Sequence, residues 1–156
     1  MSNSKNIFFL LFFTFILFSS FQTIPTESFR AKHFNIEKGL AVEGYDVVAY
    51  FKGKPKKGSS SITVKYLGIT YQFVSKENKA LFTKNPENYL PQYGGWCAYA
   101  LGAKAEKVEI DPETYKIVNG KLYLFYNAYF TNTLTLWNKD EANFLNKANQ
   151  NWSKIK

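Results

Sequence analysis

The side chains with the greatest chemical potential gather in one stretch, residues 85–100. This stretch holds the chain's single cysteine, Cys97, directly after a Gly-Gly pair and a tryptophan. A thiol can bind a soft metal ion, act as a nucleophile, take part in redox exchange, or pack as a small hydrophobe. Because turn residues and aromatic rings surround Cys97, the stretch predicts a packed junction in the fold and not a solvated linker.

A metal site at this thiol would need further ligands. A closed zinc site takes about four cysteine or histidine ligands, and the sequence supplies one of each, Cys97 and His33. With an oxygen ligand added, the candidate metal set is Cys97, His33 and Asp111, or Asp46 in place of Asp111. A thiolate also suits copper, so copper and zinc are both candidate ions.

Catalysis by Cys97 is not expected. A cysteine nucleophile needs a histidine base within hydrogen-bond reach, and His33 lies in the polar N-terminal part of the chain. The carboxylates between Glu106 and Glu113 are close in sequence, but they flank an Asp-Pro turn among lysines and predict a solvated loop. We therefore expect a protein that is not an enzyme.

A small-ligand site is the other use of Cys97. Tyr45, Asp46 and Tyr93 are polar residues within mainly apolar or aromatic segments. Phenols inside a core need hydrogen-bond partners, and Asp46 is a candidate acceptor. We expect a ligand pocket, if the fold has one, where these three residues approach Cys97.

The N-terminal segment has the pattern of an export signal. Residues 7–18 are apolar except for one threonine, which is the length of a signal-peptide core and short for a membrane-spanning helix. We expect residues 1–21 to be a signal peptide, or residues 7–21 to remain as an uncleaved membrane anchor. The protein is therefore expected in the periplasm or outside the cell, with a membrane contact only where the anchor remains.

Composition limits the expected partners. One cysteine excludes an internal disulfide framework, so a hydrophobic core must supply the stability. The net charge is +8, but the lysines are scattered along the chain, and expected export argues against nucleic acid as a partner. A protein partner or a small ligand remains as the expected partner.

The first half of the chain predicts strands followed by a helix. Residues 22–39 are polar and predict a tether or partly ordered arm, and the domain is expected over residues 40–156. A β-branched and aromatic run at 41–51 predicts a buried leading strand. Alternating residues at 62–74 predict a hairpin. Ser75 then has the position of an N-cap for a helix that should end before Asn85 and Pro86.

The second half predicts another hairpin and two helices. Residues 101–109 read as a connection, and Asn119-Gly120 between two apolar runs predicts a type I′ hairpin turn. Asn127 is a candidate cap for a helix that places Phe130, Leu134 and Trp137 on one face, and Asp140-Glu141 opens a second helix. The predicted fold class is α+β, with a small mainly antiparallel sheet of two hairpins and a leading strand packed with about three helices.

Several long motifs resemble a known family. They lie at 44–51, which reads Gly-Tyr-Asp-Val-Val-Ala-Tyr-Phe, and at 66–75, 85–100, 111–124 and 137–152. In this order they resemble the exported YHS domain-containing proteins of bacteria, over residues 40–152. The resemblance implies an extracytoplasmic, non-enzymatic protein with a YHS or treble-clef-like core.

Two positions depart from the pattern of the wider YHS group. That group is similar to small treble-clef-like metal-binding modules, in which paired cysteines near a hairpin and its following helix hold a metal ion. The cysteines would stand at Val74 and Asn78 in this chain. Valine and asparagine remove two soft ligands, which weakens the copper or zinc binding that the resemblance implies.

Three functional hypotheses follow from these residues. In the first, the protein binds a metal ion or small ligand near Cys97, with Asp46, Tyr45 and Tyr93 as ligand-binding candidates. In the second, it is a structural or protein-interaction domain without a ligand, and Cys97 is a buried core residue. In the third, Cys97 is a redox-active thiol.

Overall fold

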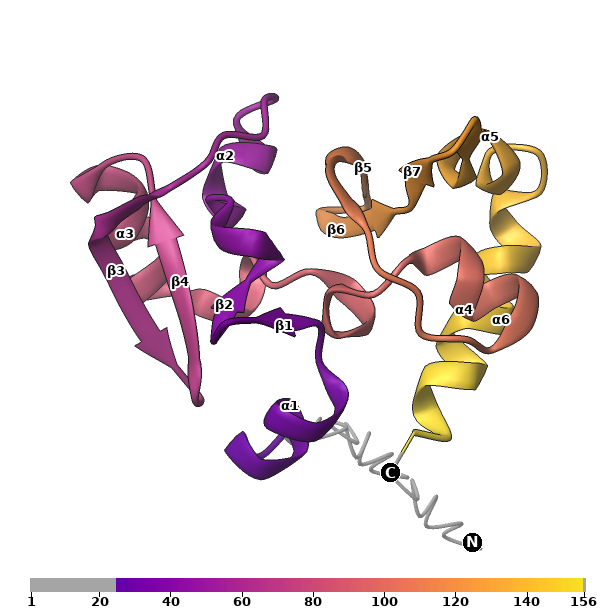
Figure 1. Ribbon diagram of the computed structural model, residues 1–156, viewed down its shortest axis with the longest axis horizontal. Helices are drawn as coiled ribbons and strands as arrows, with labels where there is room; N and C mark the ends of the chain where they lie inside the picture. The colour runs from indigo at the N-terminus through magenta and orange to yellow at the C-terminus, as the bar shows by residue number, and fades with distance from the viewer. Residues whose placement is uncertain (1–24, 156) are drawn as a thin grey trace, which may run out of the picture.

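The computed structural model describes residues 25–155 as a small α+β fold with mostly antiparallel strands, which confirms the predicted fold class. The export segment expected at residues 1–21 lies outside the described range. Figure 1 shows two groups of elements side by side, one containing α2, α3, β3 and β4, the other containing α4 to α6 and β5 to β7. Within residues 25–155, no helix is long and apolar enough to cross a membrane.

The first group is built on a four-stranded sheet with the order β1-β2-β4-β3. Its strands are β1 Ile36–Glu37, β2 Leu40–Ala41, β3 Ser59–Tyr66 and β4 Ile69–Phe73, and all neighbours are antiparallel except β2 and β4. The predicted hairpin is confirmed as β3 and β4. These four strands form the surface on which the helices of this group pack.

Helix α3, Lys76–Lys84, covers this hairpin and confirms the predicted helix after Ser75. The Ser75 hydroxyl accepts a hydrogen bond from the Asn78 amide at 3.2 Å, as an N-cap should. Phe82 is fully buried against the rings of Tyr71 and Phe73. The helix ends at Lys84 with Asn85 as its C-cap, and a short 3-10 turn, η2 Pro86–Asn88, follows.

The predicted leading strand at 41–51 is wrong beyond its first residue. After β2 the chain forms a 3-10 turn, η1 Val42–Gly44, and then a helix, α2 Val47–Phe51. Asp46 caps this helix by accepting hydrogen bonds from the amides of Val48 and Ala49. The cap satisfies two amides that would otherwise lack partners at the helix start, and it overrides the strand preference of the β-branched residues.

The second group combines short strands with three helices. Its helices are α4 Ala98–Lys104, α5 Thr133–Trp137 and α6 Glu141–Ser153. Its strands are β5 Asp111–Val118, β6 Lys121–Phe125, β7 Asn127–Ala128 and β8 Thr131–Asn132, paired as two separate hairpins. The predicted Asn119-Gly120 hairpin is confirmed as β5 and β6. Helix α4 occupies part of the stretch expected to be a connection.

The helix expected to be capped by Asn127 is capped by Asn132, five residues later. Asn127 pairs with Asn132 in the β7-β8 ribbon, and the side chain of Asn132 caps α5 by accepting from the Leu134 amide at 3.0 Å. Phe130 lies in the turn of this ribbon and is exposed, so it is not part of a helical face. Trp137 is fully buried, as expected. Of the three residues predicted to share one face of this helix, only Leu134 and Trp137 belong to α5.

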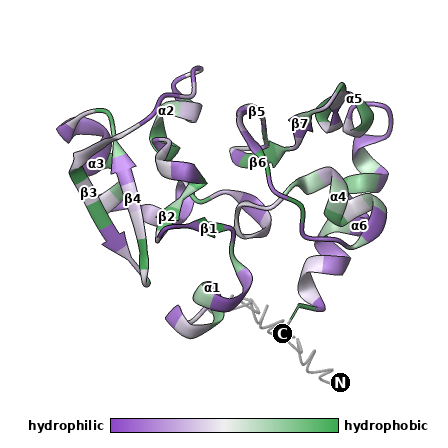
Figure 2. Cartoon of the chain, viewed as in Figure 1, coloured by the Kyte–Doolittle hydropathy of each residue, from purple (hydrophilic) through white to green (hydrophobic). Residues whose placement is uncertain are grey.

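Strand β6 lies between the two hydrophobic clusters of the protein. Leu122 and Leu124 belong to the cluster that contains Val48 and Phe73, whereas Tyr123 and Phe125 belong to the cluster around Trp137. Successive side chains of a strand point to opposite faces, so one short strand contributes to both clusters. In Figure 2 part of β6 is green, the colour of hydrophobic residues, and the strand lies in the same group of elements as α4.

The chain between the two groups runs alongside β6. A 3-10 segment, η3 Gln92–Gly95, lies between isolated bridges that pair Pro91 with Leu122 and Cys97 with Leu124. Tyr93 and Gly94 adopt positive φ angles of 57° and 62°, which turn the chain sharply before Cys97. The stretch 85–100 is thus a packed junction between the two groups of elements.

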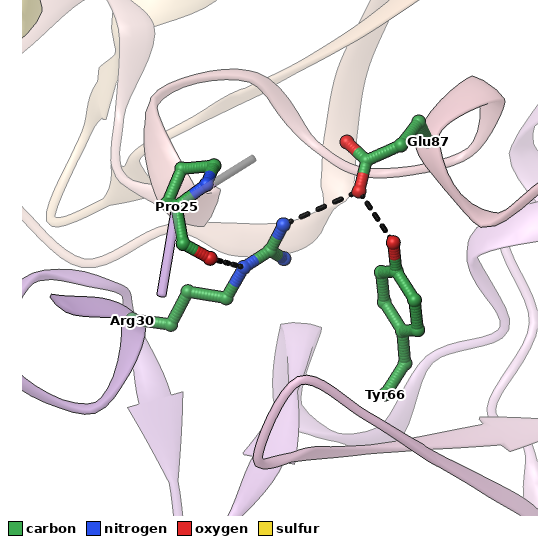
Figure 3. Close-up of polar contacts among 4 residues, drawn as sticks. All are labelled: Pro25, Arg30, Tyr66 and Glu87. Carbon is green, nitrogen blue, oxygen red and sulfur yellow. Dashed lines mark hydrogen bonds and ion pairs between the residues drawn. The ribbon is translucent and has the colours of Figure 1, made fainter. Parts of the chain in front are cut away.

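Arg30 attaches helix α1, Glu27–His33, to the rest of the domain. This helix lies within residues 22–39, which were expected to be a tether or partly ordered arm. Arg30 is only 1% exposed, and its guanidinium donates to Glu87 Oε1 at 3.3 Å and to the Pro25 carbonyl at 3.3 Å (Figure 3). It also lies over the ring of Tyr66, which donates to the same Glu87 oxygen at 2.8 Å.

We expect Arg30→Ala to lower the free energy of unfolding by about 2 kcal/mol, because the substitution removes a buried side chain and its bonds to Glu87 and Pro25. Lys32→Ala is the matched control, since Lys32 is an exposed cation on the same helix and should change stability by less than about 0.5 kcal/mol. Urea unfolding followed by circular dichroism measures both. Equal effects would show that α1 is attached by other contacts.

Candidate functional site

Cys97 lies at the junction of the two groups, at the N-cap position of α4. Its side chain is fully buried. The Sγ atom is 3.4 Å from Thr133 Oγ1 and accepts a hydrogen bond from the Tyr126 amide, also at 3.4 Å. The Cys97 amide donates to the Val108 carbonyl at 3.0 Å, so backbone and thiol are both held in place.

A pocket of about 300 Å³ lies over this thiol. Its lining comes from the junction stretch and α4, from the segment after α4, and from residues in and around β8 and α5. The lining residues are Cys97, Tyr99, Ala100, Lys104, Glu106, Val108, Tyr126, Thr131, Thr133 and Leu136. The lining therefore combines a buried thiol and a threonine hydroxyl with five aliphatic or aromatic side chains.

Two charged residues line this pocket, and both are exposed to solvent at its edge. Lys104 and Glu106 are exposed residues that follow one another closely at the end of α4. Thr133 donates its hydroxyl proton to the Tyr126 carbonyl at 2.8 Å, so its oxygen keeps acceptor capacity. This arrangement can accept a small molecule with an apolar body and a polar end.

The other predicted ligand-binding residues do not line this pocket. Asp46 is fully buried beneath α2 and α3, where its carboxylate accepts four hydrogen bonds. Two come from the amides of Val48 and Ala49, one from the Val74 amide at 2.9 Å, and one from the side chain of Asn78 at 2.7 Å. Asp46 therefore joins the start of α2 to the β4-α3 connection.

Positions 74 and 78 thus serve a different purpose from the one that the YHS resemblance implies for cysteines there. Asn78 is buried, donates to Asp46, and accepts from the Lys52 ammonium through its own carbonyl oxygen at 2.5 Å. Val74 contributes its backbone amide and leaves its side chain partly exposed. Hydrogen bonds to a buried carboxylate connect the hairpin to its helix at this place.

Tyr45 and Tyr93 do not line the pocket either, and their hydroxyl groups form hydrogen bonds in other parts of the fold. The Tyr45 hydroxyl donates to Glu113 Oε1 at 3.2 Å, and the Lys57 ammonium lies 5.3 Å from the centre of its ring. The Tyr93 hydroxyl donates to Asn149 Oδ1 on α6 at 3.0 Å. Burial raises the pKa of both phenols, and the bond to Glu113 raises the pKa of Tyr45 further. Both tyrosines therefore remain neutral hydrogen-bond donors.

The predicted metal set of Cys97, His33 and Asp111 does not converge. His33 Nδ1 is 3.2 Å from the Lys107 ammonium, and partial desolvation together with the charge of Lys107 lowers the pKa of His33. Asp111 accepts hydrogen bonds from the Glu113 amide and the Thr114 hydroxyl. Within residues 25–155, no three histidine, cysteine, aspartate or glutamate side chains form a group that could hold a metal ion.

Comparisons with protein-family models, with curated proteins and with solved structures give no match for this chain. The resemblance to YHS domain-containing proteins therefore rests on the sequence motifs, and the site must be interpreted from its own geometry.

Sequence reasoning located Cys97 but missed the residues that face it. Thr133 and Tyr126 lie far along the chain, and they reach the thiol because β6 pairs beside Cys97 and leads directly into β7 and α5. The Asn119-Gly120 turn predicts strand β6, but it does not predict that β6 pairs beside Cys97. The bridge between Cys97 and Leu124 is a long-range contact that periodicity does not reveal.

We expect Asp46→Asn to lower the free energy of unfolding by about 2 to 4 kcal/mol, because the amide group turns at least one acceptor into a donor facing buried donors. Glu109→Gln is the matched control, since Glu109 is exposed and should change stability by less than about 0.5 kcal/mol. Denaturant unfolding at neutral pH measures both variants. A loss for Asp46→Asn no larger than the control would refute its role in joining α2 to α3.

Proposed function

We propose that the protein is an extracytoplasmic, non-enzymatic binding domain of the YHS type, which holds a small and mainly apolar organic molecule in the pocket over Cys97. The observation that carries the proposal is this pocket of about 300 Å³, which lies beside the junction stretch, within the second group of elements, and has the buried Cys97 among its lining residues. The apolar run at 7–18 supports export, and the ordered motifs over 40–152 support the family.

The lining residues define the class of ligand. Ala100, Val108 and Leu136 supply aliphatic surface, and the rings of Tyr99 and Tyr126 add flat aromatic surface. Such walls bind an apolar body by excluding water. A volume of this size lies at the lower end of the range for small-molecule sites, which limits the ligand to a small molecule.

The rim residues define the polar end of the ligand. Lys104 offers a cation and Glu106 a carboxylate at the edge of an otherwise apolar pocket. Charge at an exposed rim orients a ligand more than it adds affinity. A ligand with one anionic end would place that end at Lys104 and its apolar body over the thiol.

A metal ion does not fit this pocket as well. Cys97 is the only soft ligand in the lining, and Glu106 is the only carboxylate there. Zinc and copper sites in proteins use more thiolate or imidazole ligands than this. The proposal therefore concerns an organic ligand.

A protein-interaction domain without a ligand is the second candidate. The full burial of Cys97 and its contacts with Thr133 and Tyr126 favour it, because a thiol in such surroundings can be an ordinary core residue. The two candidates differ in one respect that can be measured: only the first requires the pocket to accept a molecule.

Titration with anilinonaphthalene sulfonate tests the pocket, because this dye has an aromatic body and one anionic end and fluoresces in apolar surroundings. We expect saturable binding with one site, at least about ten-fold weaker in Leu136→Trp, which fills the pocket, and several-fold weaker in Lys104→Glu. Lys139→Glu, the same charge change at an exposed residue outside the lining, should bind as the parent does.

Each variant must keep the far-ultraviolet circular dichroism and the cooperative thermal transition of the parent, since partly unfolded proteins also bind this dye. Absence of saturable binding, or equal binding by folded Leu136→Trp, would contradict the ligand proposal and favour the interaction domain.

A further inference from the structure

The turn between β7 and β8 exposes two aromatic side chains. Tyr129 is 89% exposed and Phe130 is 112% exposed, and they are the most exposed large hydrophobic residues within the described range. They lie at the tip of a ribbon whose strand residues are Asn127 and Ala128 on one side and Thr131 and Asn132 on the other, three of them polar. Burial in the folded domain therefore does not explain why these two positions are aromatic.

The backbone of this tip is strained. Tyr129 and Phe130 have φ angles of 48° and 64°. These values lie in the left-handed region of the backbone, which residues other than glycine and asparagine rarely adopt. The other two-residue hairpin turns among residues 25–155, Lys38-Gly39, Leu67-Gly68 and Asn119-Gly120, each contain a glycine. Aromatic residues at both positions cost stability, and such strain is typical of functional segments.

The base of the ribbon is held firmly. The Asn127 side chain donates to Thr114 Oγ1 at 3.1 Å and to Asp111 Oδ2 at 3.3 Å. At the start of α5, directly after the other strand, the amide and the hydroxyl of Thr133 both donate to the Tyr126 carbonyl, at 2.9 and 2.8 Å. The two rings are thus presented on a fixed support, so little conformational freedom would be lost on insertion.

We propose that Tyr129 and Phe130 dock the protein on a membrane by inserting into the interfacial layer of a phospholipid bilayer. Aromatic rings partition into that layer, and the net charge of +8 favours a surface that contains anionic lipid. A stable protein interface buries about 800 Å² on each partner, which two side chains at the tip of a short ribbon cannot supply. Insertion into a bilayer needs no such complementary surface.

The docked orientation would also affect the pocket over Cys97. Thr131 follows Phe130 directly and lines that pocket. A domain docked through this tip therefore holds the pocket close to the bilayer, where small apolar molecules accumulate. Membrane docking does not depend on whether the pocket binds a ligand, so each proposal can fail alone.

Site-specific quenching tests the docking. Phe130→Trp is prepared in the chain as recovered after export, mixed with vesicles of phosphatidylcholine and phosphatidylglycerol, and compared with Leu81→Trp, which places the reporter at another exposed hydrophobic position. Bromine on the phosphatidylcholine acyl chains quenches only an inserted indole. After subtraction of the parent signal, we expect quenching of roughly two-fold for Trp in place of Phe130 and none for Trp in place of Leu81.

Equal quenching at the two positions, or none at either, would overturn the proposal, because both results exclude insertion of this particular tip. The comparison remains valid whether or not residues 1–21 are removed, since both variants carry the same N-terminus.

A second variant tests whether the tip is kept at the expense of stability. Tyr129→Asn combined with Phe130→Gly provides the residues that a type I′ turn prefers, so we expect the thermal midpoint to rise by several degrees. An unchanged or lower midpoint would remove the strain argument from the proposal. Exposed Leu81→Gln is the control for loss of one surface hydrophobe and should leave the midpoint nearly unchanged.

Discussion

Strand β6 has to bury both of its faces, and the rest of the structure depends on this constraint. Leu122 and Leu124 need one hydrophobic cover, and Tyr123 and Phe125 need another. The hairpin β3-β4 with α2 and α3 provides the first cover, and the helices α4 to α6 provide the second. A chain of this size can surround one short strand in this way without building a large sheet, which explains why its hairpins lie in separate sheets.

Two buried polar groups complete this arrangement, and neither needs a metal ion. The carboxylate of Asp46 joins α2 to α3 with four hydrogen bonds, and Arg30 joins α1 to the segment around Glu87. Buried charges are stable only when they are paired or fully hydrogen-bonded. The first group of elements can therefore keep its shape with Val74 and Asn78 at the positions where the YHS resemblance implies cysteines. Cys97 remains beside β6, among the residues that line the pocket of the second group.

The sequence predicted local features well and long-range ones poorly. Both hairpins and the Ser75 cap follow from turn chemistry and periodicity, which act over a few residues. The run at 41–51 became a helix because Asp46 caps it, and Phe130 left the predicted helix because Asn132, not Asn127, is the cap. The candidate site shows the same limit: Cys97 was found by its type, whereas Thr133 and Tyr126 reach it only through the pairing of Cys97 with Leu124.

The most direct measurement of the central claim is an amide NMR titration of the isotope-labelled chain with anilinonaphthalene sulfonate, because it locates the bound molecule by residue. Binding in the pocket predicts saturating shifts at Cys97, Ala100 and Thr133, with the amides of β3 and α3 unchanged. Saturating shifts confined to β3 and α3, or no saturating shifts at the pocket residues, would contradict the claim that the protein binds a small molecule over Cys97.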